Sequence, residues 1–476
     1  MAAAGAPSLV SFAVQRGEPQ LVAPARPTPY EFKMLSDIDD QDVLRFYRSG
    51  IFFVYRSNTS KAGLLDPVNV ISSALSDALV HFYPLAGRLR ELQPTRKLVV
   101  ECTGEGVVFV EADADVRMDE LGDSLAPPVP CYDKLLCEPE TPTAVVVDRP
   151  LLYVQVTRLR CGGFIFGFQI CHCMADGTGI VQFLTALTEF ARGVPGAPTV
   201  PPVWERELLT AGWPPEITIT HDHREYAPLP NHGRDMVVVN PGDAFAHQAF
   251  FFGPSEIAAI RERAPPALRS AASRFDLVGA FMWRCRVAAL RFDPDDAVRL
   301  HVFVNARVRN RSRRSVPVGY YGNAFAFAAA SAPVGELCRR PFGYTLELLL
   351  DAKARAAQEG YVQSVASFNA AHRRPPFPKA RTYLISDLTQ AGLLAVDFGW
   401  GRPVYGGPAT TMLATFHQEG RNEAGEAGIL VPIRLPAPAM ERLKQQVRKE
   451  LSADAAFKTG ERMNSDLVAC PVMAKL

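Results

Sequence analysis

The sequence predicts an α+β protein of two comparable domains, and three observations lead to this prediction. Strand-like and helix-like segments follow one another without the strict alternation that a doubly wound sheet requires. The chain has 476 residues, of which 48% are hydrophobic and 21% charged, enough for a large core and more than one domain. A proline-rich stretch over residues 194–246 breaks the periodic pattern and predicts a crossover between residues 1–193 and 247–476.

The first half opens with an extended, proline-interrupted segment over residues 21–29 and a turn-rich segment over residues 35–40. Apolar residues at helical spacing then predict an amphipathic helix over residues 68–82. Two valine-rich runs within residues 98–110 flank a Thr-Gly-Glu-Gly segment, which predicts a hairpin.

A second predicted hairpin pairs residues 151–159 with residues 164–171 across a Cys-Gly-Gly turn. It delivers His172 at its end. Ile180 and the apolar residues that follow it at helical spacing predict a helix that stops at Gly193. Strand, turn and helix are therefore adjacent in sequence around His172.

Beyond the crossover, regular structure is expected to resume at Phe250 and Phe251. The pattern predicts helices at about residues 254–264, 275–290, 343–358 and 437–451. It predicts strands at residues 299–305, 382–386, 409–416 and 428–434. Both halves thus contain mixed sheets and helices.

Composition narrows the classes of partner. A net charge of +1 gives no reason to expect nucleic acid or an acidic membrane surface, so the partners are expected to be small molecules. The nine cysteines show no metal-ligand spacing, and their odd number suits a reducing compartment. No apolar run reaches membrane-spanning length, and residues 1–14 lack the basic start of a secretory signal.

The last three residues, Ala474-Lys475-Leu476, resemble the small-basic-leucine peroxisomal address that an import receptor reads at a free C-terminus. A tail that ends in this way by chance is the alternative. The tripeptide by itself leaves both open.

The segment from His172 to Gly177 is the first candidate for chemistry. An imidazole at a strand exit can take a proton from an alcohol or amine at neutral pH. The His-x-x-x-Asp spacing would suit a metal on a helix, but the segment leaves a strand and has no third ligand nearby, so we expect no metal. A buried histidine that only satisfies a backbone group is the alternative without a catalytic role.

Acyl transfer from a thioester requires a base against the acceptor and donors for the developing oxyanion. Asp176 could orient His172 as in a catalytic triad, or it could turn away and pair with an arginine; the spacing leaves both open. The second candidate segment, Asp397-Phe398-Gly399-Trp400-Gly401, sets glycines around an indole, where backbone must pack closely.

Taken together, residues 172–177 and 397–401 resemble the paired HxxxD and DFGWG signatures of the plant BAHD acyl-CoA-dependent acyltransferases. Residues 83–88, residues 320–325 and the Ser386-Asp387 pair match the family as well. The resemblance spans Leu21 to Val431. It is closest to the benzyl alcohol O-benzoyltransferases of the family, through LVAPARPTPYEF, LSDIDDQ, GYYGNAFAF and DFGWGRPVYGGPA.

This resemblance implies two chloramphenicol-acetyltransferase-like domains, with mixed sheets flanked by helices and a solvent channel between them. His172 would be the general base in mid-channel, reached by acyl-CoA from one mouth and by the acceptor from the other. Asp176 would point away and pair with Arg307, and Gly177 would be structural. The resemblance therefore favours the pairing of Asp176 with Arg307 over a catalytic triad.

The DFGWG segment is implied to lie apart from the base, on the CoA side, with Asp397, Gly399 and Trp400 as structural residues. No cofactor is expected to be bound permanently, since acyl-CoA is a co-substrate. The residues matching the CoA side are Ser273, Arg274, Ser386 and Asp387. The chain departs from the family in an arginine-rich run, which we interpret as a solvated loop, at Arg307, Arg309, Arg311, Arg313 and Arg314.

The resemblance favours transfer of benzoyl from benzoyl-CoA to benzyl alcohol or a similar small alcohol, giving an ester such as benzyl benzoate. Hydroxycinnamoyl, acetyl or anthraniloyl donors, or an amine acceptor, form the first alternative, and a catalytically inactive binding protein the second. A role in salicylic acid metabolism would be consistent with a peroxisomal address in the C-terminal tripeptide. We therefore expect the protein to be located in the peroxisome, with the cytosol as the alternative. The family resemblance favours a monomer.

Overall fold

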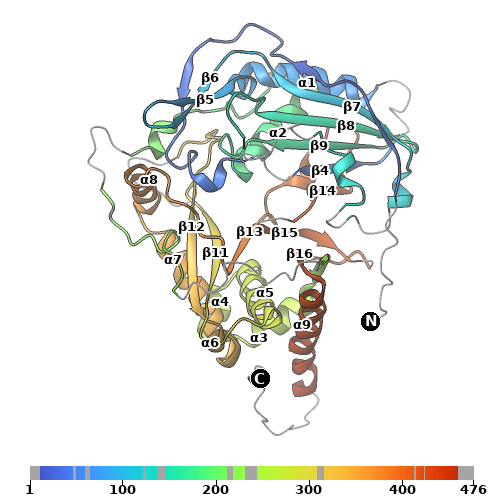
Figure 1. Ribbon diagram of the computed structural model, residues 1–476. Helices are drawn as coiled ribbons and strands as arrows, with labels where there is room; N and C mark the ends of the chain where they lie inside the picture. Colours follow the sequence, from blue (N-terminus) through green and yellow to red (C-terminus); the bar gives the residue numbers. More distant parts are fainter. Residues whose placement is uncertain are drawn as a thin grey trace.

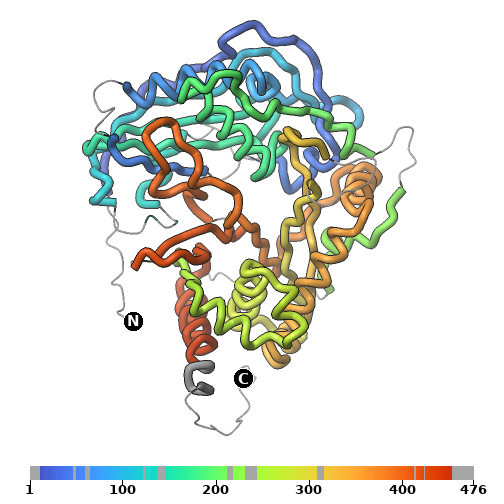
Figure 2. The backbone as a smooth tube through the Cα atoms, turned by 180° about the vertical axis from the view of Figure 1, so that it is seen from behind, coloured from blue at the N-terminus to red at the C-terminus, as the bar shows by residue number. Residues whose placement is uncertain are grey.

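The computed structural model describes residues 11–46, 50–58, 65–121, 125, 127, 129–137, 145–211, 218–230, 244–307, 316–411, 414–422 and 424–458. Two large mixed sheets form the two halves of the molecule, one above the other in Figure 1. The sequence from blue to green builds the upper half, and most of the sequence from yellow to red builds the lower half (Figure 2). The predicted α+β class with two comparable parts is confirmed.

The first sheet has seven strands. Along it lie β1 (Val14–Arg16), β7 (Val107–Ala114), β8 (Leu152–Leu159), β9 (Phe164–Ile170), β4 (Ile51–Tyr55) and β14 (Tyr405–Pro408), with β2 (Gln20–Val22) also on β7. Only β7 and β8 run parallel. Strands β4 and β9 are buried along their whole length, as expected for the middle of a sheet covered on both faces.

The predicted hairpin within residues 98–110 is wrong. Its first run is β6 (Lys97–Glu101), which pairs with β3 (Phe32–Met34) and β5 (Arg88–Leu92) in a separate three-stranded sheet, whereas its second run is β7 in the large sheet. Gly106 lies against the backbone of Val22, where a Cβ would come within 2.3 Å of the Val22 carbonyl oxygen. The glycine turn therefore carries the chain from one sheet to the other instead of folding it back.

The second hairpin is confirmed: β8 and β9 are antiparallel and adjacent. The second sheet has six strands, in the order β10 (Phe245–Phe252), β16 (Ala427–Pro436), β15 (Ala414–Arg421), β13 (Thr382–Asp387), β11 (Ala297–Asn305) and β12 (Phe325–Pro333). Strand β13 is parallel to both of its neighbours. The strand predicted at residues 409–416 is displaced, because β14 ends at Pro408 and β15 begins at Ala414.

Most of the described helices follow the predicted apolar spacing, but those over residues 266–271, 334–339 and 361–371 were not predicted. They are α1 (Pro67–His81), α2 (Gly177–Ala191), α3 (Pro254–Glu262), α4 (Pro266–Ala271), α5 (Arg274–Leu290), α6 (Val334–Arg339), α7 (Phe342–Ala356), α8 (Tyr361–Ala371) and α9 (Ala437–Lys458). Asp66 caps α1 by accepting from the Val68 N–H, and Gly193 ends α2 with φ +67°. Short 3₁₀ turns are η1 (Asp42–Leu44), η2 (Tyr83–Ala86), η3 (Met118–Leu121), η4 (Tyr132–Lys134), η5 (Arg206–Leu209) and η6 (Leu393–Ala395).

Two features tie the halves together. The crossover contacts both: η5 carries Arg206, which binds Asp39 of the first half, while His223 binds Ser364 in α8 of the second. In addition, β14 belongs by sequence to the predicted second domain but pairs with β4 of the first sheet. Within the described residues, no helix has the combination of length and apolar character that a membrane span needs.

Candidate active site

His172 lies two residues past the end of β9, the second strand of the hairpin. The strand is buried throughout, so the position of its exit is fixed by the packed sheet. The His172 N–H donates to the Phe46 carbonyl at 2.9 Å, and the imidazole lies beside the Phe46 ring, with ring centroids 5.5 Å apart. With only 5% of the residue exposed, the imidazole sits in a site from which most water is excluded.

Asp176 is the N-cap of α2. Its Oδ1 accepts from the Gly179 N–H at 3.0 Å and from Arg307 Nη2 at 3.0 Å. Its Oδ2 accepts from Arg307 Nη1 at 2.7 Å and from the Ala324 N–H at 3.0 Å. The carboxylate therefore joins the first turn of α2, from the first half, to residues that flank β11 and β12 of the second half.

The charge state of Asp176 follows from these contacts. Burial by itself would raise the pKa of this carboxyl, but Arg307 and the two backbone N–H donors outweigh burial and lower the pKa. The bidentate arginine contact is the geometry that holds a carboxylate most specifically. Both oxygens are thus engaged in holding the helix start, which favours the arginine-paired arrangement over a triad.

Gly177 and Gly179, at the start of α2, differ in whether the space around them would admit a side chain. A Cβ on Gly177 would meet only a side-chain atom of Leu388 at 3.8 Å, an ordinary contact. A Cβ on Gly179 would lie 1.9 Å from the Tyr321 carbonyl oxygen. The close approach of α2 to the segment before β12 therefore depends on Gly179, a residue that the sequence analysis did not single out, rather than on Gly177.

The DFGWG segment lies away from His172. Asp397 Oδ1 accepts from the N–H groups of Gly399 at 2.7 Å and Gly401 at 2.9 Å, and both glycines have positive φ, +102° and +91°. The Trp400 ring meets Phe164 edge-on at 5.3 Å, at the start of β9. Since a strand rises about 3.3 Å per residue, this contact lies roughly 20 Å from the other end of β9 at Ile170, beyond which His172 follows. The geometry suits a structural loop.

The four residues matched to the CoA side gather at one end of the second sheet. Ser273 is the N-cap of α5, and its hydroxyl group is bonded to Asp276 at 2.7 Å, while Arg274 is exposed in the first turn. Ser386 and Asp387 end β13. The Phe275 ring lies 5.0 Å from that of His417, the register partner of Asp387, so the two pairs are neighbours.

Three adjoining cavities lead away from the start of α2. The first, about 20 Å³, is apolar and bordered by Ile51, Gly177, Ile180, Leu388 and Phe416. The second, about 180 Å³, shares Leu388 and Leu393 with the first, and shares Gly406 and Glu419 with the third. Together they widen from the interior toward the outside of the molecule.

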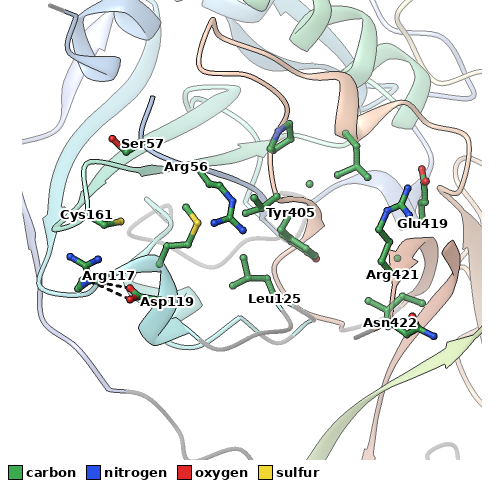
Figure 3. A pocket seen from close by; sticks show the side chains of 17 residues that line it. Arg56, Ser57, Arg117, Asp119, Leu125, Cys161, Tyr405, Glu419, Arg421 and Asn422 are labelled. Carbon is green, nitrogen blue, oxygen red and sulfur yellow. Dashed lines mark hydrogen bonds and ion pairs between the residues drawn. The ribbon is translucent and has the colours of Figure 1, made fainter. Parts of the chain in front are cut away.

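The outermost cavity, about 850 Å³, lies between the two halves (Figure 3). Arg56 and Arg117 line it from the first half, and Tyr405, Glu419 and Arg421 line it from β14 and β15. This cavity places one polar opening between the two sheets. No group of three or more metal-ligating side chains occurs among the residues that the structure describes.

The comparisons with known proteins agree with this geometry. The sequence model of the Transferase family matches residues 12–450. The benzyl alcohol O-benzoyltransferase of Petunia hybrida is 49% identical over 450 residues, which cover 93% of this chain and 95% of that protein. The chain belongs to the BAHD acyltransferase family. The alcohol acyl transferase 1 allele GSa of Malus domestica is 46% identical over 438 residues, covering 92% of this BAHD chain and 94% of that protein.

Solved structures of similar fold support the architecture of this BAHD protein. The crystal structure of vinorine synthase matches with a TM-score of 0.68 at 21% identity, covering 92% of this chain and 98% of that one. The structure of F. graminearum TRI101 complexed with ethyl coenzyme A matches with a TM-score of 0.63 at 17% identity, covering 88% and 97%. The expected fold of two chloramphenicol-acetyltransferase-like parts is confirmed.

Some residues of the site were missed, and some lie outside the described residues. Phe46 and Gly179 carry no motif of their own, and only their neighbours in space give them a role. Two predicted segments fall outside the described residues. The first is residues 308–315, with Arg309, Arg311, Arg313 and Arg314, and the second is the C-terminal tripeptide Ala474, Lys475 and Leu476. The solvated-loop interpretation is wrong for Arg307, whose side chain is largely buried against Asp176. For the other four arginines it stays a prediction, as does the C-terminal address.

Proposed function

We propose that this protein transfers the benzoyl group of benzoyl-CoA to benzyl alcohol or a similar small alcohol and releases an ester such as benzyl benzoate. The observation that carries the proposal is the 49% identity, across nearly the whole chain, with a benzyl alcohol O-benzoyltransferase. The buried His172 imidazole and the small apolar cavity that borders the start of α2 support the assignment to an acyl-CoA-dependent alcohol O-acyltransferase.

In the proposed mechanism, His172 accepts the proton of the alcohol hydroxyl while the oxygen attacks the thioester carbonyl carbon. The tetrahedral intermediate carries the charge on the former carbonyl oxygen. Its collapse breaks the carbon–sulfur bond, and the protonated His172 gives its proton to the leaving CoA thiolate. The imidazole ends neutral, so one group serves as base and then as acid. Asp176 and Arg307 keep the loop in place and touch no reacting atom.

The co-substrate is proposed to be acyl-CoA, with no permanently bound cofactor. We propose Ser273, Arg274, Ser386 and Asp387 as its contacts, supported by their common location at the end of β13 and the start of α5. Arg274 is the exposed cation that a CoA phosphate would need. A monomeric state is proposed on the family resemblance alone.

A donor and acceptor panel tests this function most directly. With benzyl alcohol as acceptor, benzoyl-CoA should give free CoA and benzyl benzoate, identified by mass, at a higher kcat/KM than acetyl-, hydroxycinnamoyl- or anthraniloyl-CoA. The 46% identity to an alcohol acyl transferase favours other acyl donors and alcohols as the second candidate. An acetyl preference, or an amide from an amine acceptor, would overturn the benzoyl assignment. No free CoA with any pair would favour an inactive binding protein.

We also propose that Ala474-Lys475-Leu476 directs the protein to peroxisomes, in a plant route toward salicylic acid or aromatic esters, with the cytosol as the alternative. A fluorescent fusion at the N-terminus should be punctate and overlap a peroxisomal marker. Deletion of Leu476 should make it diffuse, because the receptor reads a free C-terminal leucine. Punctate signal that survives the deletion would contradict this address.

A further inference from the structure

Three polar side chains from distant parts of the chain meet beneath the His172 loop. Asp39 comes from the turn before η1, Arg206 from η5 in the crossover, and Asn323 from the segment before β12. They are 0%, 1% and 0% exposed, respectively. Groups of this polarity are buried so completely only when their hydrogen bonds are made within the protein.

Asp39 is the centre of this cluster. Its Oδ1 accepts from Arg206 Nη1 at 3.1 Å, from the Asn323 N–H at 2.9 Å and from Asn323 Nδ2 at 2.9 Å. Its Oδ2 accepts from the Ser36 hydroxyl group at 2.6 Å and the Ser36 N–H at 3.1 Å. One carboxylate therefore joins the first half, the crossover and the second half at a single point.

The Arg206 guanidinium is held in place by its surroundings as well as by its charge partner. It lies over the rings of Trp204, Tyr320 and Tyr321, at 4.4, 5.1 and 5.0 Å from their centroids. Burial lowers its pKa, but the Asp39 carboxylate and the two tyrosines outweigh burial and raise it, so it stays charged. A Cβ on Gly322 would lie 1.2 Å from its Nη1, which explains the glycine in the GYYGN segment.

The cluster reaches the catalytic loop through two backbone carbonyls. Asn323 Nδ2 donates to the carbonyl oxygen of His172 itself at 2.8 Å, and Arg206 Nη2 donates to that of Met174 at 2.9 Å. With the His172 N–H bonded to the Phe46 carbonyl, both backbone polar groups of His172 are fixed. The buried cluster thus holds the peptide units from which the imidazole projects.

We infer that Asn323, Arg206 and Asp39 are positioning residues for His172, which act on the reaction through the backbone of the loop and touch no substrate. The inference rests on the proposed function, because it concerns the proposed general base. A buried ion pair contributes little net stability, and fixing one geometry is a use for which such pairs are retained. Displacing a reacting group by about 1 Å can lower the rate about 100-fold.

The test starts with Asn323→Ala, which removes both bonds of the side-chain amide, to the His172 carbonyl and to Asp39, and leaves the Asp39–Arg206 ion pair and the Asn323 backbone N–H in place. We expect kcat and the single-turnover rate of acyl transfer to fall 10- to 100-fold, with the KM of acyl-CoA and of alcohol within twofold of wild type. Asn369→Ala is the matched control. Asn369 is as buried and also donates two hydrogen bonds, to the Tyr226 hydroxyl group in the crossover and to the Val365 carbonyl in α8, instead of to the His172 loop.

Two results would overturn the inference. One is a kcat for Asn323→Ala within twofold of wild type. The other is an equal loss of kcat in the Asn369→Ala control, which would show that lost stability alone lowers the rate. Wild-type enzyme without acyl transfer from any donor would instead contradict the proposed function, so the two failures are distinguishable.

A combined substitution separates positioning from a general effect. If Asn323 acts through His172, then adding Asn323→Ala to His172→Ala should change the residual rate less than twofold. A further 10-fold loss in the double variant would contradict the inference.

Arg206→Lys should lower kcat at least 10-fold, because a lysine cannot bridge Asp39 and the Met174 carbonyl as the guanidinium fork does. The control Arg299→Lys alters another buried arginine, which binds carbonyls of the crossover.

Discussion

Replacing His172 with alanine should lower kcat about 1,000-fold, within the range that a positioned general base contributes. The binding of acyl-CoA should change little, because the imidazole acts on the alcohol proton and the thiolate. The release of CoA thiol measures the turnover of the variant, and equilibrium binding of benzoyl-CoA measures its affinity for the donor. We expect the first to fall and the second to stay near wild type. The fold should persist, since the hydrogen bonds that hold this part of the loop come from the backbone of His172.

His372→Ala is a suitable control. His372 is an exposed histidine at the end of α8, bonded to its own helix, and its removal should leave kcat unchanged. A His172→Ala variant with more than a tenth of wild-type kcat would show that another group accepts the proton. The assignment of the base would then be wrong even if the enzyme proved to be a benzoyltransferase.

The second large effect is expected for Asp176→Asn. The amide cannot neutralise Arg307, which is left largely buried without its ion-pair partner, and breaking a buried pair in this way costs about 3–5 kcal/mol. Thermal unfolding should shift to lower temperature. We also expect kcat to fall at least 10-fold, because the same carboxylate fixes the start of α2 five residues beyond His172.

The pH dependence of stability gives a second measurement of this pair. Because the folded pKa of Asp176 is lowered, its contribution to stability is complete above the unfolded value, about 3.9, and is lost as pH falls through the folded pKa. Wild type should therefore lose more stability on acidification than Asp176→Asn. Asp296→Asn, which removes the carboxylate paired with the buried Arg381 in the second half, should reduce stability without a selective loss of kcat. Equal loss of kcat in both variants would contradict a specific role for Asp176.

The sequence predicted most of the helices because their apolar spacing records a buried face. Helices α1, α2 and α5 also carry caps that mark their ends, such as Asp66 and Ser273. Strand pairing was predicted less well. The pattern placed the strands β6 and β7 correctly but joined them in one hairpin, since alternation shows that a segment is a strand and does not show which neighbour it pairs with.

The site shows the same division between local and spatial information. The motif with His172 and Asp176 was found because its residues are contiguous, and Arg307 was found only through the family resemblance. Asp39, Arg206 and Gly179 could not be given a role, because each acts through a contact to a residue far away in sequence. The motifs LSDIDDQ and GYYGN were recognised in the sequence only as matches to the family. The structure explains them, because Asp39 of the first and Asn323 of the second meet in the buried cluster.

The position of β14 has a consequence for how the protein is made. Strand β4 is complete at Tyr55, but the strand that covers its free edge, β14, begins at Tyr405 and is synthesised about 350 residues later. At 5–20 residues per second, a ribosome needs roughly 20–70 s to cover that distance. During this interval the nascent chain exposes an apolar sheet edge, the kind of surface on which chains aggregate. We therefore expect the early half to need protection from aggregation until β14 has been synthesised.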